Sequence, residues 1–123
     1  MLVFPGQGAQ YPGMGSDLFG AFDSVRELYE QASAIVGYDM AKLSFQDPDD
    51  QLNFTRFTQP ALLTHELACW HALGSLTGQS LAPAMAAGHS LGEYSALVAA
   101  GSLSFETALR LVQRRGELMG EFG

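Results

Sequence analysis

The five residues Gly88-His89-Ser90-Leu91-Gly92 fit the pattern G-x-S-x-G, in which a sharp turn between a strand and a helix exposes a serine hydroxyl. Glycines are expected in such a turn, because the two backbones approach too closely for a Cβ atom and the backbone angles are strained. Free N–H groups at the start of the helix would stabilise an oxyanion beside the hydroxyl. Ser90 is therefore the candidate nucleophile of an acyl transfer or an ester hydrolysis.

Arg115 is the second residue whose type and position could serve chemistry. It lies in a helical pattern, four residues after Leu111 and three after Val112, so its side chain points towards the apolar side. A guanidinium cannot lose its proton, and an unpaired buried charge is costly, so Arg115 needs an anionic partner. Two interpretations remain open: an internal carboxylate or an extended side chain that reaches water, and a substrate carboxylate held by two hydrogen bonds.

Short elements around these residues must position them. Residues 83–87 are apolar enough for a buried parallel strand before the turn, and residues 91–100 favour a helix after it. Residues 1–4 predict another strand, followed by a glycine-rich loop over residues 6–13. Ligands of open α/β sheets bind beyond the carboxyl ends of the strands, so the loop and the serine turn are neighbours if their strands are adjacent. The loop lacks the glycine spacing and the lysine of nucleotide-binding loops, which disfavours a phosphate site.

Two more helices are predicted before the serine turn. Residues 24–36 are amphipathic and end at Gly37. A second helix opens at Thr58-Gln59-Pro60, with the threonine as cap and the proline at its first position, and it has a wide apolar face that predicts burial against a sheet. The side chains assigned to that face are Leu62, Leu63, Leu67, Cys69, Trp70, Leu73 and Leu76.

The last predicted helix carries Arg115. Ser104 caps it, and its apolar arc runs through Met119. Arg114 falls opposite this arc, where an arginine side chain is normally solvated.

The composition favours one globular unit over residues 1–123, with no second complete domain. The chain is 47% hydrophobic, and its net charge of −7 argues against nucleic acid or an anionic membrane surface as the main partner.

The single cysteine, Cys69, cannot form an internal disulfide and is predicted to be a buried, inert thiol in a reducing compartment, the cytoplasm. We find no apolar run long enough for a signal sequence or a membrane span. His65 and His71 lack metal-ligand spacing, so no metal site is predicted and structural roles are expected for both.

Four separated motifs support a more specific interpretation. They are FPGQGAQ from Phe4, TQPAL from Thr58, GHSLGEYSAL from Gly88, and Arg115-Gly116. In order and spacing they resemble the N-terminal part of malonyl-CoA:acyl carrier protein transacylases and of the acyltransferase domains of polyketide and fatty acid synthases. The resemblance covers essentially the whole chain. It implies an α/β fold with a hydrolase-like core, in which helices flank a short parallel sheet.

The resemblance also implies a mechanism. Ser90 attacks malonyl-CoA, coenzyme A leaves, and the malonyl ester passes to the phosphopantetheine thiol of acyl carrier protein, without a cofactor. By the same likeness the backbone N–H groups of Gln7 and Leu91 form the oxyanion hole, and Arg115 pairs with the free malonyl carboxylate. Leu91 resembles the malonyl rather than the methylmalonyl type. An acetyl group would bind poorly, because it would leave the guanidinium unpaired.

The chain also departs from this family. Members are well over twice its length, and both their general-base histidine and a ferredoxin-like subdomain lie in the portion absent here. Gln59 and His89 match positions near the family's site and are assigned supporting roles. His89 adjoins the serine, but successive side chains diverge at a strand end, so it is poorly placed as the base. We therefore expect the 123 residues to be one piece of a larger enzyme and inactive without the remainder.

Two other functions remain open from the sequence. A serine hydrolase or thioesterase could use the same elbow, although it would not need an arginine for a carboxylate. Alternatively, the chain is a catalytically silent fragment that binds a complementary chain or a carrier protein. Acylation of Ser90 by malonyl-CoA rather than acetyl-CoA separates the first alternative from the transacylase, and malonyl transfer by the 123 residues alone would exclude the second.

Overall fold

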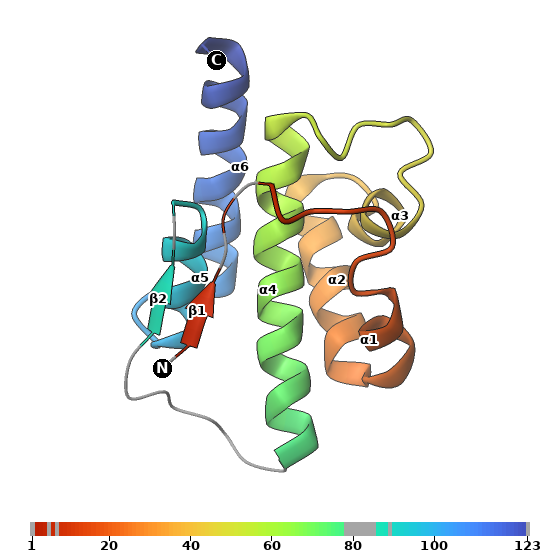
Figure 1. Ribbon diagram of the computed structural model, residues 1–123, viewed down its shortest axis with the longest axis vertical. Helices are drawn as coiled ribbons and strands as arrows, with labels where there is room; N and C mark the ends of the chain where they lie inside the picture. The colour runs from red at the N-terminus through yellow and green to blue at the C-terminus, as the bar shows by residue number, and fades with distance from the viewer. Residues whose placement is uncertain (1, 5, 7, 78–85, 89, 123) are drawn as a thin grey trace.

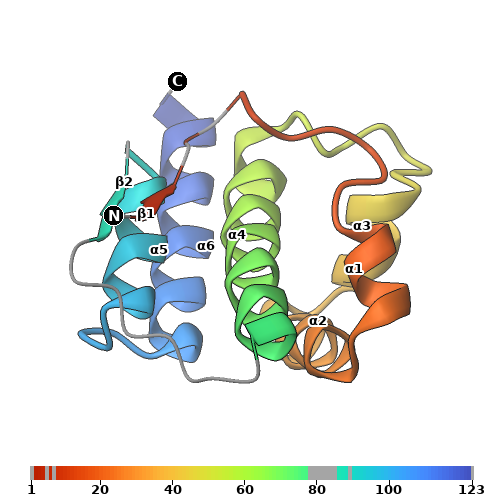
Figure 2. The ribbon, with the colours of Figure 1, turned by 60° about the horizontal axis from the view of Figure 1, so that its bottom comes forward.

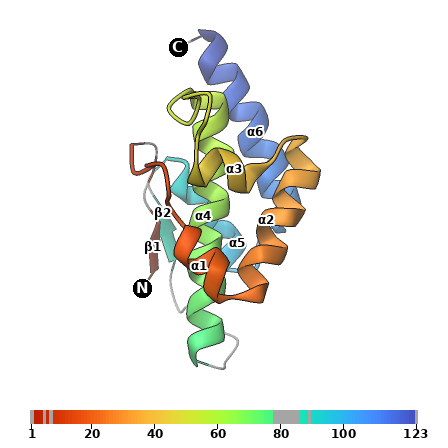
Figure 3. The same ribbon diagram turned by 90° about the vertical axis from the view of Figure 1, so that its right-hand side faces the viewer.

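The computed structural model describes residues 2–4, 6, 8–77, 86–88 and 90–122, which are mostly helical (Figure 1). In chain order the elements are β1 Leu2–Phe4, α1 Ser16–Ala21, α2 Asp23–Val36, α3 Met40–Phe45, α4 Thr55–Thr77, β2 Ala86–Gly88, α5 Gly92–Ala99 and α6 Phe105–Phe122. Helix α4 runs through the middle, with the strands and α5 on one side and α1 and α3 on the other (Figure 2). Helix α6 packs along α4 and also contacts α2 and α5. Figure 3 shows the strands on one side of α4, with α2 and α6 on the other.

The two strands pair in parallel, with Leu2 opposite Ala86 and Phe4 opposite Gly88. This confirms the adjacency on which the predicted meeting of loop and serine turn depends. The carboxyl ends of β1 and β2 lie at the same edge, so the segments that follow them leave the sheet together. The described part of the predicted second strand begins at Ala86, since residues 83–85 lie outside the described residues.

Helix α4 begins at Thr55, three residues before the predicted start, and Pro60 lies inside it. The predicted capping role of Thr58 is wrong: its hydroxyl donates to the backbone carbonyls of Leu52 and Phe54. A Thr-Gln-Pro sequence favours a helix start locally. Here the tertiary packing of the preceding turn outweighs the one backbone hydrogen bond that the proline removes.

Gly116 allows α6 to approach the first turn of α4. A Cβ atom at Gly116 would lie 2.9 Å from the carbonyl oxygen of Thr55 and 3.0 Å from the Cα atom of Arg56, closer than side chains normally pack. The preceding residue on α6 is Arg115. Close approach of the helices therefore brings Arg115 to α4, where Gln59 lies one turn further along.

The apolar face assigned to α4 is buried over its first half only. Leu63 and Leu67 are fully buried, whereas Cys69 is exposed and Leu73 and Leu76 are 41% and 73% exposed. The described contacts of α4 are mainly with α2, α5 and α6. Burial of this face against a sheet and burial of the Cys69 thiol are therefore wrong predictions. The C-terminal end of α4 extends below α1 and α2 in Figure 1, and Leu76 near that end is mostly exposed.

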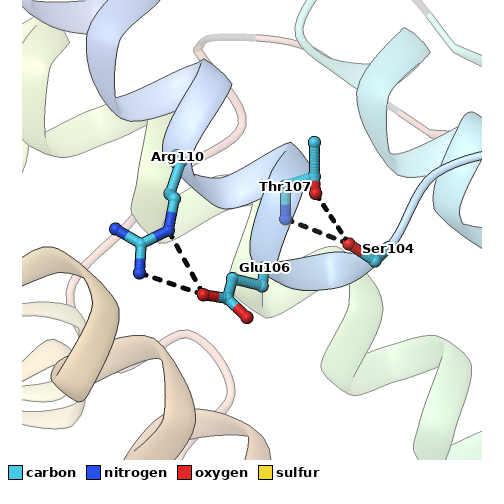
Figure 4. A network of polar contacts seen from close by, with 4 residues as sticks. All are labelled: Ser104, Glu106, Thr107 and Arg110. Carbon is cyan, nitrogen blue, oxygen red and sulfur yellow. Dashed lines mark hydrogen bonds and ion pairs between the residues drawn. The ribbon is translucent and has the colours of Figure 1, made fainter.

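Ser104 caps α6 as predicted. Its side-chain oxygen accepts a hydrogen bond from the N–H of Thr107 at 3.2 Å, and its hydroxyl donates to the Thr107 hydroxyl at 2.9 Å (Figure 4). In the same turn Glu106 pairs with Arg110 at 3.0 Å. A cap and an i,i+4 ion pair of this kind stabilise the start of a helix.

The faces of α6 divide largely as expected. Arg114 is exposed and pairs with Glu117 at 3.3 Å, which confirms its solvated position. Over residues 105–120, the buried apolar side chains are Ala108, Leu109 and Val112. Met119 is 41% exposed, so the predicted apolar arc ends before it.

Helices α2 and α5 agree with the predictions to within one residue at each end. At the end of α2, Gly37 adopts a φ of 89° and donates its N–H to the carbonyl of Ser33 at 3.0 Å. Periodicity does not predict α1 and α3, because each has only six residues. None of the helices in the described part of the chain combines the length and the apolar character needed to span a lipid bilayer.

Candidate active site

The turn between β2 and α5 has the shape of a nucleophile elbow. Ser90 is exposed and has a φ of 55°, in the left-handed region that side chains other than glycine rarely adopt. A Cβ atom at Gly88 would overlap the carbonyl group of Gly92 and the amide nitrogen of Glu93. The strand and helix backbones are therefore in direct contact, as predicted, and only glycine fits at position 88.

Replacing Ser90 with glycine is expected to raise the free energy of unfolding by about 1 kcal/mol, because glycine adopts a positive φ without the steric cost that serine bears. Urea unfolding of the two proteins measures this difference. Ser102→Gly, at another exposed turn position, serves as the control and is expected to gain no stability. An unchanged or lower free energy for Ser90→Gly would contradict the inferred strain.

The side chain of Arg115 lies directly beside the serine. Its Nη2 donates a hydrogen bond to Ser90 Oγ at 2.9 Å, and its Nη1 donates to Gln59 Oε1 at 2.8 Å. The guanidinium carbon also lies 5.8 Å from the ring centroid of Tyr94. Three elements thus converge, α4 with Gln59, α5 with Tyr94, and α6 with Arg115.

No carboxylate among the described residues lies at ion-pair distance from Arg115. The two other arginines of α6, Arg110 and Arg114, each pair with a glutamate of the same helix. Of the interpretations left open by the sequence, an internal carboxylate therefore has no support within the described chain. The guanidinium is half-buried and held by neutral groups, which leaves its charge available to an anion.

Gln59 orients the guanidinium. Its side chain is 1% exposed, and its Oε1 must face Arg115 because a guanidinium offers only donors. The amide Nε2 then faces Met119 and donates to its Sδ at 3.1 Å. A chain of contacts therefore runs from Met119 through Gln59 and Arg115 to Ser90.

Two residues at the site, Tyr94 and Met119, have no role predicted from the sequence. Met119 was recognisable from helical spacing, since it lies four residues after Arg115 on α6, whereas Ser90 precedes α5 and no helical spacing relates it to Tyr94. A side chain four residues from a site residue on a helix shares its face. Helical spacing predicts which face a side chain lies on, but not which side chains it contacts. Here the contacts depend on how three helices pack.

Of the remaining predicted site residues, the structure describes Leu91 but not Gln7 or His89. Leu91 follows the serine and is fully buried, and its backbone forms the start of α5, where helix N–H groups lack partners from a preceding turn. Gln7 and His89 lie outside the described residues. The parallel pairing of Phe4 with Gly88 brings the described start of the glycine-rich loop, Gly6, to the same edge of the sheet as the serine turn.

The described histidines lie on α4, away from these contacts. His65 sits against Gly15, and burial lowers its pKa, so its imidazole is neutral at pH 7. His71 is exposed. Within the described ranges, no group of three or more His, Cys, Asp or Glu side chains is placed to hold a metal ion.

Glu66 is a buried carboxyl group on α4 that contacts α5, the helix that follows Ser90. Its side chain accepts a hydrogen bond from the hydroxyl of Ser95 on α5 at 2.6 Å. The residue is only 5% exposed, and this burial raises its pKa from 4.5 to about 7, although the bond from Ser95 acts in the opposite direction.

Glu66 makes stability depend on pH. Because its pKa is higher in the folded chain, the folded state holds the proton more tightly, and stability is lost as the pH rises from about 4.5 to about 7. The expected loss is about 3 kcal/mol, from a shift of about 2.5 pKa units at 1.36 kcal/mol each. Urea unfolding over this pH range measures it, and Glu66→Gln is expected to remove the corresponding slope. A slope that persists in Glu66→Gln would assign it to another group.

Comparison with known proteins matches almost the whole chain to one protein family. The sequence profile described as acyl transferase domain matches residues 1–122. The chain is 50% identical over 119 residues to the malonyl CoA-acyl carrier protein transacylase of Escherichia coli, covering 97% of this chain and 38% of that protein. It is 49% identical over 117 residues to a polyketide biosynthesis malonyl CoA-acyl carrier protein transacylase of Bacillus subtilis, covering 95% of this chain and 39% of the relative.

Solved structures of malonyl transacylases have a fold similar to that of this chain. The transacylase from Clostridium perfringens superposes with a TM-score of 0.89 at 43% identity, over 96% of this chain and 36% of that one. A malonyl-transacylase solved in complex with a type II polyketide synthase acyl-carrier protein has a TM-score of 0.88 at 50% identity, over 98% of this chain and 38% of its own. The chain thus spans less than two fifths of the length of each of these relatives.

Proposed function

Because the chain belongs to the acyl transferase domain family, we propose that it supplies the nucleophile and the carboxylate-binding arginine of a malonyl-CoA:acyl carrier protein transacylase. The reaction serves fatty acid or polyketide biosynthesis, the two contexts in which the relatives are named. We call the protein in which these residues act together with a catalytic base the complete enzyme.

In the first half of the proposed reaction, Ser90 Oγ attacks the thioester carbonyl of malonyl-CoA while a base takes its proton. The negative charge that develops on the carbonyl oxygen is stabilised by the backbone N–H groups of Leu91 and Gln7. The carbon–sulfur bond then breaks, and coenzyme A leaves as the thiol after it takes a proton from the base. In the second half the phosphopantetheine thiol attacks the serine ester, and Ser90 regains its proton.

The contact between Arg115 and Ser90 is the observation that carries this proposal. A half-buried guanidinium without a carboxylate partner in the described chain lies 2.9 Å from the nucleophile oxygen. The malonyl carboxylate replaces this hydrogen bond to an uncharged hydroxyl with a two-pronged ionic one. Its arrival also frees the serine hydroxyl from Arg115, so that substrate binding and release of the nucleophile are coupled.

The catalytic base and the rest of the core come from outside these residues in our proposal. The β1 edge next to α4 is open: Val3 is 67% exposed, and a cavity of about 270 Å³ lies between Val3, Phe4 and α4. We propose that the remainder of the enzyme covers this face and completes a hydrolase-like core with a ferredoxin-like subdomain. Since this chain carries a net charge of −7, a basic patch that docks an acidic carrier protein would also come largely from the remainder.

The experiment that tests the proposal is labelling of the complete enzyme with malonyl-CoA and with acetyl-CoA, followed by mass spectrometry of the peptide that contains Ser90. We expect malonylation to dominate and to be absent from Ser90→Ala. Addition of acyl carrier protein bearing its phosphopantetheine group is expected to remove the label and to yield malonyl carrier protein. Equal labelling by the two thioesters would overturn the assignment of Arg115.

The same experiment separates the alternatives. A serine hydrolase or thioesterase would release free malonate from the labelled serine and would leave the carrier protein unmodified. A silent binding fragment would take no label in any preparation. For the 123 residues alone we expect little labelling, because without a base the serine hydroxyl is a weak nucleophile. We propose the cytoplasm as the site of the reaction.

A further inference from the structure

A buried hydrogen bond connects the central helix to the nucleophile helix. Ser95 Oγ on α5 donates to Glu66 Oε1 on α4 at 2.6 Å, a length typical of a hydroxyl bound to a carboxylate. Ser95 is fully buried and Glu66 is 5% exposed. Competition from water is therefore weak, and the bond ties two elements that are 29 residues apart in sequence.

Glu66 lies on the same face of α4 as Gln59. The two residues are seven positions apart, which is two helical turns or about 10 Å along the axis. Gln59 holds Arg115 of α6, and Glu66 holds Ser95 of α5. One face of one helix therefore fixes both the cation and the helix that follows the nucleophile.

Any displacement of α5 must move the nucleophile, because the backbone that joins Ser90 to α5 is short and held by close contacts. Only Leu91 separates Ser90 from the start of α5, and the carbonyl of Ser90 accepts the N–H of Glu93 at 3.0 Å. The backbone of Gly92 packs so closely on Gly88 that a Cβ atom would overlap it. A hydrogen bond that holds α5 at Ser95, five residues after the nucleophile, thus also holds the turn.

A carboxyl group is an unfavourable choice for packing alone. The second oxygen, Oε2, is buried without a hydrogen-bond partner among the described residues, and a buried polar atom in that condition destabilises the fold. Within the described chain, the titratable groups beside Glu66 are on its own helix, Cys69 one turn later and the neighbouring His65, while α5 presents the hydroxyl of Ser95. None of them is a cation that would compensate an ionised carboxylate.

From this arrangement we propose that Glu66 is a positioning residue, which sets the place of Ser90 relative to Arg115 by holding α5 through Ser95. The inference deepens the proposed function and, for its kinetic part, rests on it. Glu66 does not touch the substrate. It acts on the nucleophile only through Ser95 and the backbone of α5.

Four variants of the complete enzyme test this role: Glu66→Gln, Glu66→Met, Ser95→Ala and the double variant Glu66→Met/Ser95→Ala. The amide of Gln retains an acceptor for Ser95, whereas Met has a similar size without one. We expect Glu66→Met and Ser95→Ala each to lower the acylation rate at saturating malonyl-CoA by about 10-fold with little change in KM, because the nucleophile is misplaced while the carboxylate site is intact. Glu66→Gln is expected to acylate at close to the rate of the unmodified enzyme, because it keeps the acceptor.

The double variant tests whether Glu66 acts through Ser95. We expect it to be no slower than either single variant, since both remove the same bond. Glu30→Gln, an exposed glutamate on α2, is the matched control and is expected to acylate at the unmodified rate. The proposal would be overturned if the rate loss of the double variant equalled the product of the two single losses. It would also be overturned if Glu66→Gln acylated as slowly as Glu66→Met.

A second measurement does not require activity. Hydrogen exchange of the α5 amides is expected to be faster in Glu66→Met and Ser95→Ala than in the unmodified protein, and unchanged in Glu66→Gln. If the unmodified enzyme takes no malonyl label, the proposed function fails and the exchange result alone decides the positioning role. Equal α5 exchange in all variants would refute that role whatever the labelling shows.

Discussion

Arg115→Ala in the complete enzyme is expected to reduce kcat/KM for malonyl-CoA by about 30- to 1000-fold, which corresponds to about 2–4 kcal/mol of transition-state free energy. The side chain contacts Ser90 and Gln59 through two hydrogen bonds and has no carboxylate partner among the described residues. Its loss would leave the malonyl carboxylate in a half-buried site without a counter-ion. Reaction with acetyl-CoA, which has no carboxylate, is expected to change much less.

The neighbouring arginine offers a matched control. Arg114 has the same charge but is exposed and pairs with Glu117, so Arg114→Ala is expected to leave kcat/KM within about 2-fold. Arg115→Lys keeps the charge but cannot hold a carboxylate in the two-pronged geometry, and an intermediate loss is expected. Thermal unfolding of each variant checks that the fold is intact. Unchanged kinetics in Arg115→Ala would remove the basis of the malonyl assignment.

Gly88→Ala is expected to have the largest effect on the fold, a loss of about 4 kcal/mol or more in the free energy of unfolding. The added Cβ would overlap the backbone of Gly92 and Glu93, which are main-chain atoms that cannot rotate away as a side chain can. Relief requires β2 and α5 to separate, and that displaces Ser90. Urea unfolding measures the stability, and malonyl labelling of Ser90 measures the loss of the nucleophile's position.

Gly20→Ala is the control for this substitution. Gly20 lies in α1, and a Cβ atom there meets nothing within 4 Å. Alanine is a better helix former than glycine, so the free energy of unfolding is expected to be unchanged or slightly higher. If Gly88→Ala were as well tolerated as Gly20→Ala, the direct contact between strand and helix at the elbow would be disproved.

Much of the local structure was predictable from the amino-acid sequence. The cap at Ser104 and the stop at Gly37 follow from side-chain and backbone chemistry that acts within one helical turn. The start of α4 was not predictable in this way. Thr58 and Pro60 have the local character of a helix start, whereas the helical turn that precedes them packs against Gly116, in a distant part of the chain.

The exposure of side chains shows a similar division. Periodicity places Leu63 and Cys69 on one broad apolar surface of α4, yet the first is fully buried and the second is exposed. A pattern identifies which face of a helix is apolar, but how far along the helix that face is covered depends on the lengths and positions of its neighbours. The contact of Glu66 with Ser95 was equally inaccessible, since neither residue type nor spacing reports which buried polar groups meet.

The sequence by itself determined the elbow, because a turn between Gly88 and Gly92 depends on atoms only a few bonds apart, and it marked Arg115 as a cation on the apolar side of its helix. Only the tertiary structure decided that Arg115 reaches Ser90, 25 residues away in sequence, and Gln59, 56 residues away. These contacts exist because α6 approaches α4 closely at Gly116 while α4 also holds α5. Local sterics act within a turn, whereas the distance between two helices is set by every side chain packed between them.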